Sequence, residues 1–303
     1  MFQERLLPDG DVVLNVAEGP KSGGPLVLLH GVVRCWQDFV PLLPALVTRW
    51  HVYGLDFRGH GGSQPAPDAY LVTDYVRDAV QFISTQFETP VVLFGHSLGA
   101  MVAAAVAAEL PERVCGLVLE DPPFDTMGSR IRQTSFHSYF AALFELVQRR
   151  LPVAALAREL AELRITTPGQ SESVRLGNLR DAVALRFVAR CCNSLDPEVL
   201  RPIVAGRWLD GYRCDEILRS ITCPTLLLQG DETVGGMLSD ADASEVASLV
   251  ADCLHIKLPG TGHLIHSLQT ETTLRHVQGF LESLPPVAVR GKPHHSHSRK
   301  SLA

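Results

Sequence analysis

The feature that most constrains the fold is a series of short apolar runs that alternate with longer stretches of helical spacing. The runs PLVLLHG at 25–31, HVYGLD at 51–56 and PVVLFGHS at 90–97 are rich in Val and Leu and lack polar alternation. Strands of this kind are typical of a parallel sheet that is covered on both faces. The intervening stretches 73–87 and 98–110 carry apolar residues at helical intervals. The alternation predicts an α/β fold with a mostly parallel, doubly wound sheet.

This alternation is interrupted once, after Asp121, and resumes at residue 223. The residues in between contain helical pieces broken by Pro and Gly, and no convincing strand. We therefore predict a core formed by 1–121 and 223–284, with a helical cap inserted at 122–222. The segment 285–303 is rich in Pro, Ser, His and basic residues, and we predict that it is disordered. Further strands are expected at 11–19, 114–121, 223–231 and 254–260, and further helices at 138–150, 179–191, 197–209, 240–251 and 270–284.

Composition narrows the classes of partner. The 303 residues are 46% hydrophobic and 20% charged, as in ordinary globular proteins, and the formal net charge is -6. No basic stripe is available to neutralise phosphates, so small molecules are expected as partners and nucleic acid is not. The most apolar segment, Gly99 to Ala108, is too short for a membrane span of about 20 residues. The N-terminus MFQERLLPDGD lacks the apolar stretch of a secretory signal, so we expect a cytoplasmic location without a membrane span.

Cofactor and metal motifs are missing from the sequence. The seven cysteines are scattered and form no CxxC pair, which argues against a disulfide framework and a zinc site. The glycine-rich RGHGGS segment lacks the Lys of a phosphate loop and contains no G-x-G-x-x-G. We therefore predict that the protein uses no metal and no cofactor. The sequence carries no feature that specifies an oligomeric state.

A candidate nucleophile stands in the motif GHSLG at 95–99, between the apolar strand VVLF and the helical AMVAAAVAAEL. A G-x-S-x-G motif on a sharp strand-to-helix turn exposes its serine hydroxyl at the carboxyl edge of a sheet. The N–H groups that follow belong to a helix N-terminus and stabilise negative charge. This context predicts that Ser97 is a nucleophile and that the Leu98 N–H is an oxyanion donor. The alternative is that Ser97 only caps the helix.

A second oxyanion donor must come from an early strand-to-helix loop. The sequence His30-Gly31-Val32 ends such a strand, and we predict that the Val32 N–H is this donor, with Gly31 allowing close approach to the substrate carbonyl. An ordinary turn is the alternative interpretation. Arg34, next to this loop, is a candidate contact for an anionic substrate or the partner of a surface salt bridge.

The candidate general base lies late in the chain. His263 follows the glycine-rich turn of PGTGHLIH, where a base distant in sequence would reach the serine. Histidine can accept the serine proton and return it to the leaving group. His266 lies three residues further on, and His263 is preferred because it alone directly follows the G-T-G turn.

Together these motifs resemble the α/β-hydrolase family: LLHG with Trp36 five residues after Gly31, DFRGHGGS at 56–63, GHSLG and PGTGH, in the family's order and at its usual distances. The resemblance covers about 1–121 and 223–284. It is strongest to the cap-bearing branch of esterases, lactonases and C–C hydrolases. Epoxide hydrolases and haloalkane dehalogenases look similar but have aspartate at the nucleophile position, which Ser97 occupies here.

The acid of the triad departs from the family's pattern. The family usually places it in G-x-x-D after the next-to-last strand, but Thr233 occupies that position here. Asp121, at the end of GLVLED, matches relatives that supply the acid one strand earlier, and it is our preferred candidate. Asp231 is the second candidate, and Glu120 and Glu232 are the remaining ones. The acid is expected to bond the Nδ1–H of the catalytic histidine.

The resemblance implies a cofactor-free serine hydrolase that cleaves a carboxylic ester or lactone through an acyl-serine intermediate. Two alternatives stay open. One is C–C bond hydrolysis, perhydrolysis or lyase chemistry on the same fold, and the other is a non-catalytic ligand-binding protein that retains the site.

Overall fold

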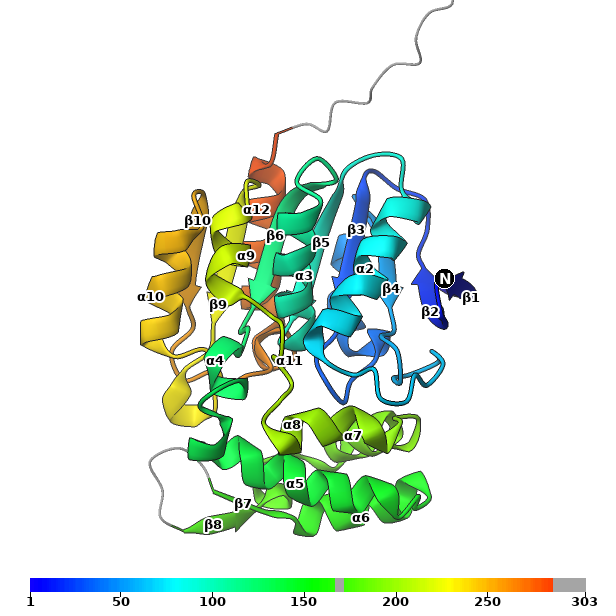
Figure 1. Ribbon diagram of the computed structural model, residues 1–303, viewed down its shortest axis with the longest axis vertical. Coiled ribbons are helices and arrows are strands. Elements are labelled where there is room, and N and C mark those ends of the chain that lie inside the picture. Colours follow the sequence, from blue (N-terminus) through cyan, green and yellow to red (C-terminus); the bar gives the residue numbers. More distant parts are fainter. Residues whose placement is uncertain (167–171, 286–303) are drawn as a thin grey trace, which may run out of the picture.

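An eight-stranded sheet organises the structure, a computed structural model that describes residues 1–166 and 172–285. Its strand order is β1-β2-β4-β3-β5-β6-β9-β10. The strands from β4 to β10 are parallel to one another, whereas β2 runs antiparallel to both β1 and β4. The predicted mostly parallel sheet is thus confirmed (Figure 1). The strands are β1 (Gln3–Asp9), β2 (Val12–Glu18), β3 (Pro25–Leu29), β4 (His51–Leu55), β5 (Val91–His96), β6 (Val114–Glu120), β9 (Thr225–Gln229) and β10 (Cys253–Lys257).

Helices cover both faces of this sheet, which confirms the doubly wound arrangement. Successive residues of β3 show why its sequence is apolar throughout. Leu26 and Leu28 belong to the buried cluster that includes residues of η1, α1 and α12 on one face, whereas Val27 and Leu29 belong to the cluster that includes residues of α2 and α3 on the other. The helices of the two faces are η1 (Trp36–Phe39), α1 (Leu43–Leu46), α2 (Val72–Gln86), α3 (Leu98–Glu109), α9 (Cys214–Ser220), α10 (Asp240–Leu249), α11 (Ile265–Leu268) and α12 (Thr270–Ser283).

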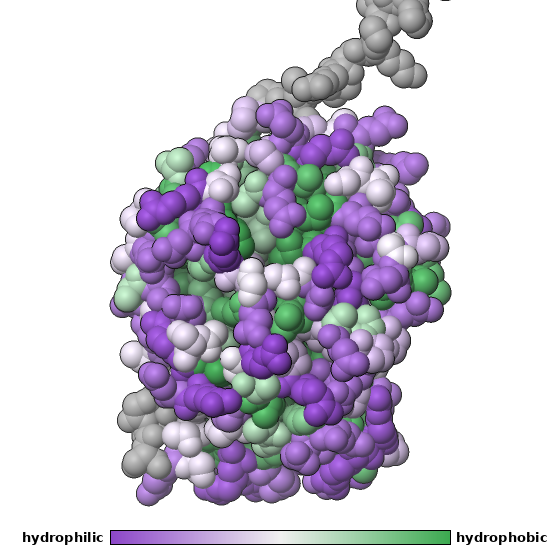
Figure 2. Space-filling view, viewed as in Figure 1, coloured by the Kyte–Doolittle hydropathy of each residue, from purple (hydrophilic) through white to green (hydrophobic). Residues whose placement is uncertain are grey.

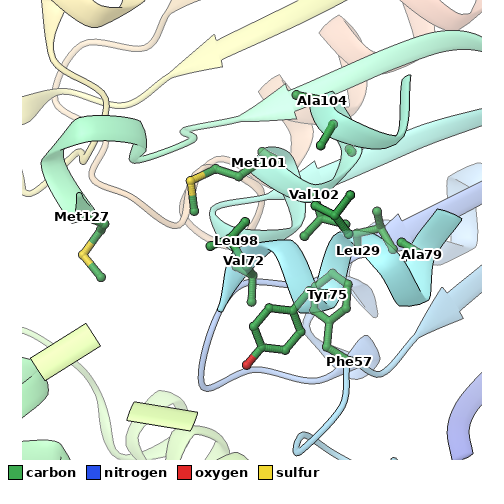
Figure 3. Packing of buried hydrophobic residues seen from close by; sticks show 14 of the residues in the cluster. Leu29, Phe57, Val72, Tyr75, Ala79, Leu98, Met101, Val102, Ala104 and Met127 are labelled. Atoms are coloured by element: carbon green, nitrogen blue, oxygen red, sulfur yellow. The ribbon is translucent and has the colours of Figure 1, made fainter. Parts of the chain in front are cut away.

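Helix α3 is the centre of the core. Ten of its residues are buried, among them Leu98, Met101 and Val102, which pack against Val72 and Tyr75 of α2 (Figure 3). A helix that is apolar on all sides must be buried on all sides. Since α3 begins at the residue after Ser97, the elbow is fixed to the best packed part of the protein.

One strand of the eight-stranded sheet was not predicted. β1 has the sequence QERLLPD, and most of its residues are exposed at the edge of the sheet. Charged residues and Pro are common on edge strands, where they discourage pairing with other chains. Because these residues form no apolar run, the pattern that identified the inner strands does not identify β1.

Between β6 and β9 the chain forms a mostly helical layer beyond the carboxyl edge of the sheet (Figure 1). The expectation of no strand in this segment was wrong, because β7 and β8 form a two-stranded antiparallel hairpin. Each has only three residues, too few for a period to be seen. The elements of the layer are α4 (Phe124–Met127), η2 (Ile131–Gln133), α5 (Ser135–Gln148), α6 (Val153–Glu162), β7 (Arg164–Thr166), β8 (Ser173–Arg175), η3 (Leu176–Asn178), α7 (Ala182–Asn193), η4 (Pro197–Leu200) and α8 (Arg201–Ala205).

The division into a core and a cap at 122–222 stays a prediction. Helix α9 falls inside the predicted cap, but it packs beside α3 and α10 with the helices of the sheet. The predicted disordered tail lies outside the described residues, except for residue 285. No helix among the described residues is long and apolar enough to cross a membrane.

The close contact between α3 and β3 generates a test. A methyl group added at Gly99 would lie 1.9 Å from the backbone oxygen of Leu29, so the helix would have to move away from the sheet. We expect Gly99→Ala to lower the free energy of unfolding by about 2 kcal/mol or more, as measured by urea denaturation.

Gly279→Ala is the matched control, because nothing lies within 4 Å of the added methyl group on α12. Better helix propensity should raise the free energy of unfolding there, by up to about 1 kcal/mol. Equal effects of the two substitutions would contradict the close packing of α3 on β3.

Candidate active site

Ser97 occupies a strained turn between β5 and α3. Its backbone has φ 55° and ψ −115°, a region that residues with a Cβ rarely adopt. The Ser97 N–H donates to the carbonyl of Glu120 on the neighbouring strand β6 at 2.9 Å. The elbow is closed by Gly95 and Gly99, since a Cβ at Gly95 would lie 2.1 Å from the Gly99 oxygen. The strain is therefore held by tight backbone contacts on both sides.

The turn after β3 lies directly against this elbow. A Cβ at Gly31 would lie 3.2 Å from Cβ of Ser97 and 2.9 Å from Cδ2 of His96. The turn is closed by the Arg34 N–H, which donates to the Gly31 carbonyl at 3.2 Å. Within the described residues, neither the Val32 N–H nor the Leu98 N–H donates to a backbone carbonyl. Both predicted oxyanion donors are thus unused by the backbone.

His263 contacts Asp121. Its Nδ1 lies 2.6 Å from Oδ2 of Asp121, and because a carboxylate can only accept, Nδ1 carries the proton. In the neutral ring this leaves the lone pair on Nε2 free to accept another proton. The His263 ring also lies 4.6 Å from the ring of His96, the residue before Ser97. The histidine loop and the elbow are therefore neighbours.

Backbone amides hold the Asp121 carboxylate in place. Oδ1 accepts from the N–H of Gly230 at 2.9 Å and of Leu238 at 3.3 Å, and Oδ2 accepts from the N–H of Met237 at 2.8 Å. Asp121 itself is fully buried, and like Ser97 it has a positive φ, of 45°. These contacts aim the carboxylate at His263 and fix its orientation.

The other acid candidates lie elsewhere. Asp231 accepts from Thr233 and from the Gly260 N–H, and these bonds lower its pKa to about 2. Glu232 accepts from the N–H of Asp240. Glu120 is buried, but it bonds His266. Within the described residues, only Asp121 among the four candidates bonds His263.

Glu120 and His266 form a buried pair beneath this site. The backbone N–H and the ring Nδ1 of His266 donate to Oε1 of Glu120 at 3.0 and 2.9 Å. On the other side, Nε2 of His266 lies 3.6 Å from Oδ2 of Asp38, and Asp38 in turn pairs with Nε of Arg34 at 3.6 Å. Nδ1 of His96 lies 3.3 Å from Glu120. Arg34 therefore belongs to a structural ion-pair network, which we call the Glu120–His266 network.

The charges in this network follow from its geometry. Burial alone would lower the pKa of His266, but Glu120 and Asp38 beside it raise that pKa to about 10. Burial alone would raise the pKa of Glu120, but His266 and His96 hold it well below its ordinary value. Burial lowers the pKa of His96, so this ring is neutral. Opposite charges thus alternate from Arg34 to Glu120.

Two further histidines support the turn after β3. The Nδ1–H of His30 donates to the Gly31 carbonyl at 2.8 Å, and its Nε2 accepts from the N–H of Phe57 at 3.1 Å. Burial lowers the pKa of His30 to about 4 and that of His60 to about 3. Both are neutral parts of the core. Asp56 fixes the same region by accepting from the Trp36 N–H at 2.7 Å.

His96, Glu120 and His266 are also the kind of residues that bind metals, and their ligand atoms lie within 4.8 Å of one another. Glu120 already accepts from Nδ1 of His266 and lies 3.3 Å from Nδ1 of His96. The charges balance through Asp38 and Arg34 without a further cation. The group is therefore explained as an ion-pair network.

The seven cysteines are free thiols. Cys35, just after the turn, and Cys191 of α7 lie closest, with 3.5 Å between their sulfur atoms.

A groove of about 490 Å³ lies on the outer face of α2 and α3, away from this site. It is lined by apolar residues such as Val76 and Ala105 and bordered by charged ones such as Arg77 and Glu216. Figure 2 shows apolar surface over α3 and α2 surrounded by polar side chains. Ser97 and His263 do not line the groove, so it plays no part in their chemistry.

The sequence alone identifies His96 only as a structural or surface group and His266 as a rival base, and it does not reveal the network that joins them. One feature of the sequence could have indicated the network. Glu120 ends an otherwise apolar strand, and a carboxylate buried there needs a cationic partner. Which of the histidines supplies the partner depends on the folded chain.

The raised pKa of His266 makes stability depend on pH. The unfolded chain loses the His266 proton near pH 6.5, whereas the folded chain keeps it until about pH 10. The free energy of unfolding should therefore be unaffected by this group below pH 6.5 and should fall above it, by up to about 1.4 kcal/mol per pH unit. Urea denaturation between about pH 6.5 and 7.5, below the ordinary Cys pKa of about 8.5, measures the slope.

His266→Gln is the comparison, because it removes the titrating group and keeps hydrogen-bonding capacity. We expect a smaller slope in this variant. The same slope in both proteins would mean that His266 is not the group responsible.

Comparison with known proteins agrees with this geometry. A sequence profile of the alpha/beta hydrolase family matches residues 26–273. The chain is 26% identical over 294 residues to a 2-(acetamidomethylene)succinate hydrolase of Mesorhizobium japonicum, covering 93% of this chain and 96% of the relative. It is 27% identical over 277 residues to an sn-1-specific diacylglycerol lipase of Xenopus tropicalis, covering 90% and 82%.

Solved structures share the fold at low sequence identity. An E-2-(acetamidomethylene)succinate hydrolase superposes with a TM-score of 0.71 at 23% identity, covering 93% of this chain and all of the other. An enol-lactonase from Burkholderia xenovorans gives 0.70 at 17% identity, covering 92% of this chain and all of the other. The match across most of its length shows that the chain belongs to the alpha/beta hydrolase family, a family of hydrolytic enzymes.

Proposed function

We propose that this protein is a serine hydrolase that cleaves a carboxylic ester or lactone through an acyl-enzyme. Ser97 is the nucleophile, His263 the general base, and Asp121 the acid that orients His263. The observation that carries the proposal is the hydrogen bond of 2.6 Å between His263 and Asp121, next to an elbow that strains Ser97. A serine that only capped α3 would need neither this pair nor the strain.

The reaction follows from these positions. Nε2 of His263 takes the hydroxyl proton while Oγ of Ser97 attacks the carbonyl carbon. The carbonyl oxygen becomes an anion and accepts from the N–H groups of Val32 and Leu98. The imidazolium then gives its proton to the leaving alkoxide, and an acyl-Ser97 forms. Water, deprotonated by His263, attacks the acyl carbon, and the acid product leaves as Ser97 regains its proton.

The names of related proteins support hydrolysis of a carbonyl substrate and guide the choice of compounds. They include a diacylglycerol lipase and an enol-lactonase, which supports an ester or lactone. The relative from Mesorhizobium japonicum is named for a succinate that carries an acetamidomethylene group. A substrate panel should therefore contain esters and lactones of graded acyl length, with and without a carboxylate, and one such enamide.

The nucleophile can be tested without knowing the substrate. A fluorophosphonate probe should label the folded wild-type protein at Ser97, as located by peptide mass spectrometry. Ser97→Ala should lose both labelling and hydrolysis, by a factor of at least about 1000. Turnover by the wild type without any trapped acyl adduct would favour the C–C hydrolase or lyase alternative. Binding of panel compounds without turnover would favour a ligand-binding protein.

The acid can be assigned with a matched pair of substitutions. Asp121→Asn should reduce kcat by about 1000-fold or more, because an amide can donate to Nδ1 and stabilise the wrong tautomer of His263. Asp231→Asn changes the same group at an exposed position that does not contact His263, and it should leave kcat within about threefold of the wild type. A loss of kcat in Asp231→Asn alone would reverse the assignment.

A further inference from the structure

The Glu120–His266 network joins the four segments that carry the proposed catalytic groups. His96 ends β5 one residue before Ser97, and Glu120 ends β6 one residue before Asp121. His266 stands on α11, three residues after His263. Asp38 lies on η1, in the segment that follows the turn after β3. This turn, Gly31 to Arg34, carries the proposed oxyanion donor Val32 and is called the oxyanion turn below. No other ion-pair chain among the described residues reaches all four segments.

His96 is the point at which this network meets the reacting groups. Its ring is pressed between Glu120 on one side, with 3.3 Å from Nδ1 to Oε1, and Gly31 on the other. Its centroid lies 4.6 Å from that of His263 and 5.1 Å from that of His266. A shift of Glu120 would therefore move a ring that touches both the oxyanion turn and the general base.

His266 and Asp38, at the other end of the network from His96, are also held by their neighbours. His266 is fully buried, and its ring stacks on Phe39 at 5.1 Å. The charged and titratable groups that face it are Glu120 from β6, Asp38 from η1 and His96 from β5. Asp38 is anchored in turn by Arg34, whose N–H closes the turn at Gly31. The network thus contacts the oxyanion turn at both ends: Arg34 is part of the turn, and the ring of His96 lies against Gly31. Asp38, His266 and Glu120 connect these two ends.

We propose that Glu120 and His266 are positioning residues, which hold the oxyanion turn and His263 in register with Ser97 through the ring of His96. This inference rests on the proposed serine chemistry. Neither residue contacts substrate, so their loss should lower kcat and change KM little. Displacements of about 1 Å at a reacting group can cost about 100-fold in rate.

The test uses the double variant Glu120→Gln/His266→Gln, with His266→Gln alone as its companion. The double variant removes both charges together, so no buried charge is left without a partner. Val246→Ala is the control, because Val246 is buried on α10 outside the site and its truncation destabilises the fold without touching the network. Labelling of Ser97 by a fluorophosphonate is measured at a temperature at which circular dichroism shows every variant folded.

We expect the rate of labelling to fall about 10- to 100-fold in both network variants and to stay within about twofold in Val246→Ala. On a substrate from the panel, kcat should fall by the same factor. Wild-type labelling rates in folded network variants would overturn the inference, because a purely structural role changes only the folded fraction.

A second readout separates this inference from the proposed function. The proton between Nδ1 of His263 and Oδ2 of Asp121, 2.6 Å apart, should give a far-downfield NMR signal, and this readout needs no activity. We expect this signal to shift or broaden in the double variant and to stay unchanged in Val246→Ala. If the wild type is not labelled at Ser97, the proposed function fails, and the NMR signal alone decides the inference: an unchanged signal in the double variant overturns it.

Discussion

The strained backbone of Ser97 is the constraint on which the rest of the site depends. A positive φ at a residue with a Cβ persists only where its surroundings leave no alternative. Here Gly99 brings α3 against the end of β3, and the Ser97 N–H is tied to β6. The proposed nucleophile is therefore positioned by a buried parallel strand and a buried apolar helix. A loop could not hold the same conformation.

Most strands of the sheet could be predicted from the sequence, because burial on both faces requires a continuous run of apolar residues. β3 is apolar throughout and β5 is apolar up to Gly95, and the helices between the strands carry a helical period. The edge strand β1 and the hairpin of β7 and β8 leave no such trace, since their residues are largely exposed or too few. Pattern analysis thus detects elements that bury surface and misses elements that do not.

The residues of the site also fall into those that could be predicted from a local motif and those that could not. Ser97, Gly31 and Val32 occupy local motifs whose geometry is set within a few residues, so their neighbourhood could be anticipated. Whether Asp121 or Asp231 bonds His263 could not be predicted from the local sequence. It depends on three backbone amides, from Gly230, Met237 and Leu238, which lie more than a hundred residues after Asp121 and point at its carboxylate. The partner of Glu120 was hidden for the same reason.

Two adjacent acids at the end of β6, Glu120 and Asp121, bond different histidines. Glu120 is the last residue of the strand and bonds the buried His266, whereas Asp121, the next residue, has a φ of 45° and bonds His263. A single residue inserted into β6 would move Glu120 to the place of Asp121, and a single deletion would move Asp121 to the place of Glu120, so either change would disrupt both pairs at once. The Glu120–His266 pair and the Asp121–His263 pair therefore both depend on the length of this one strand.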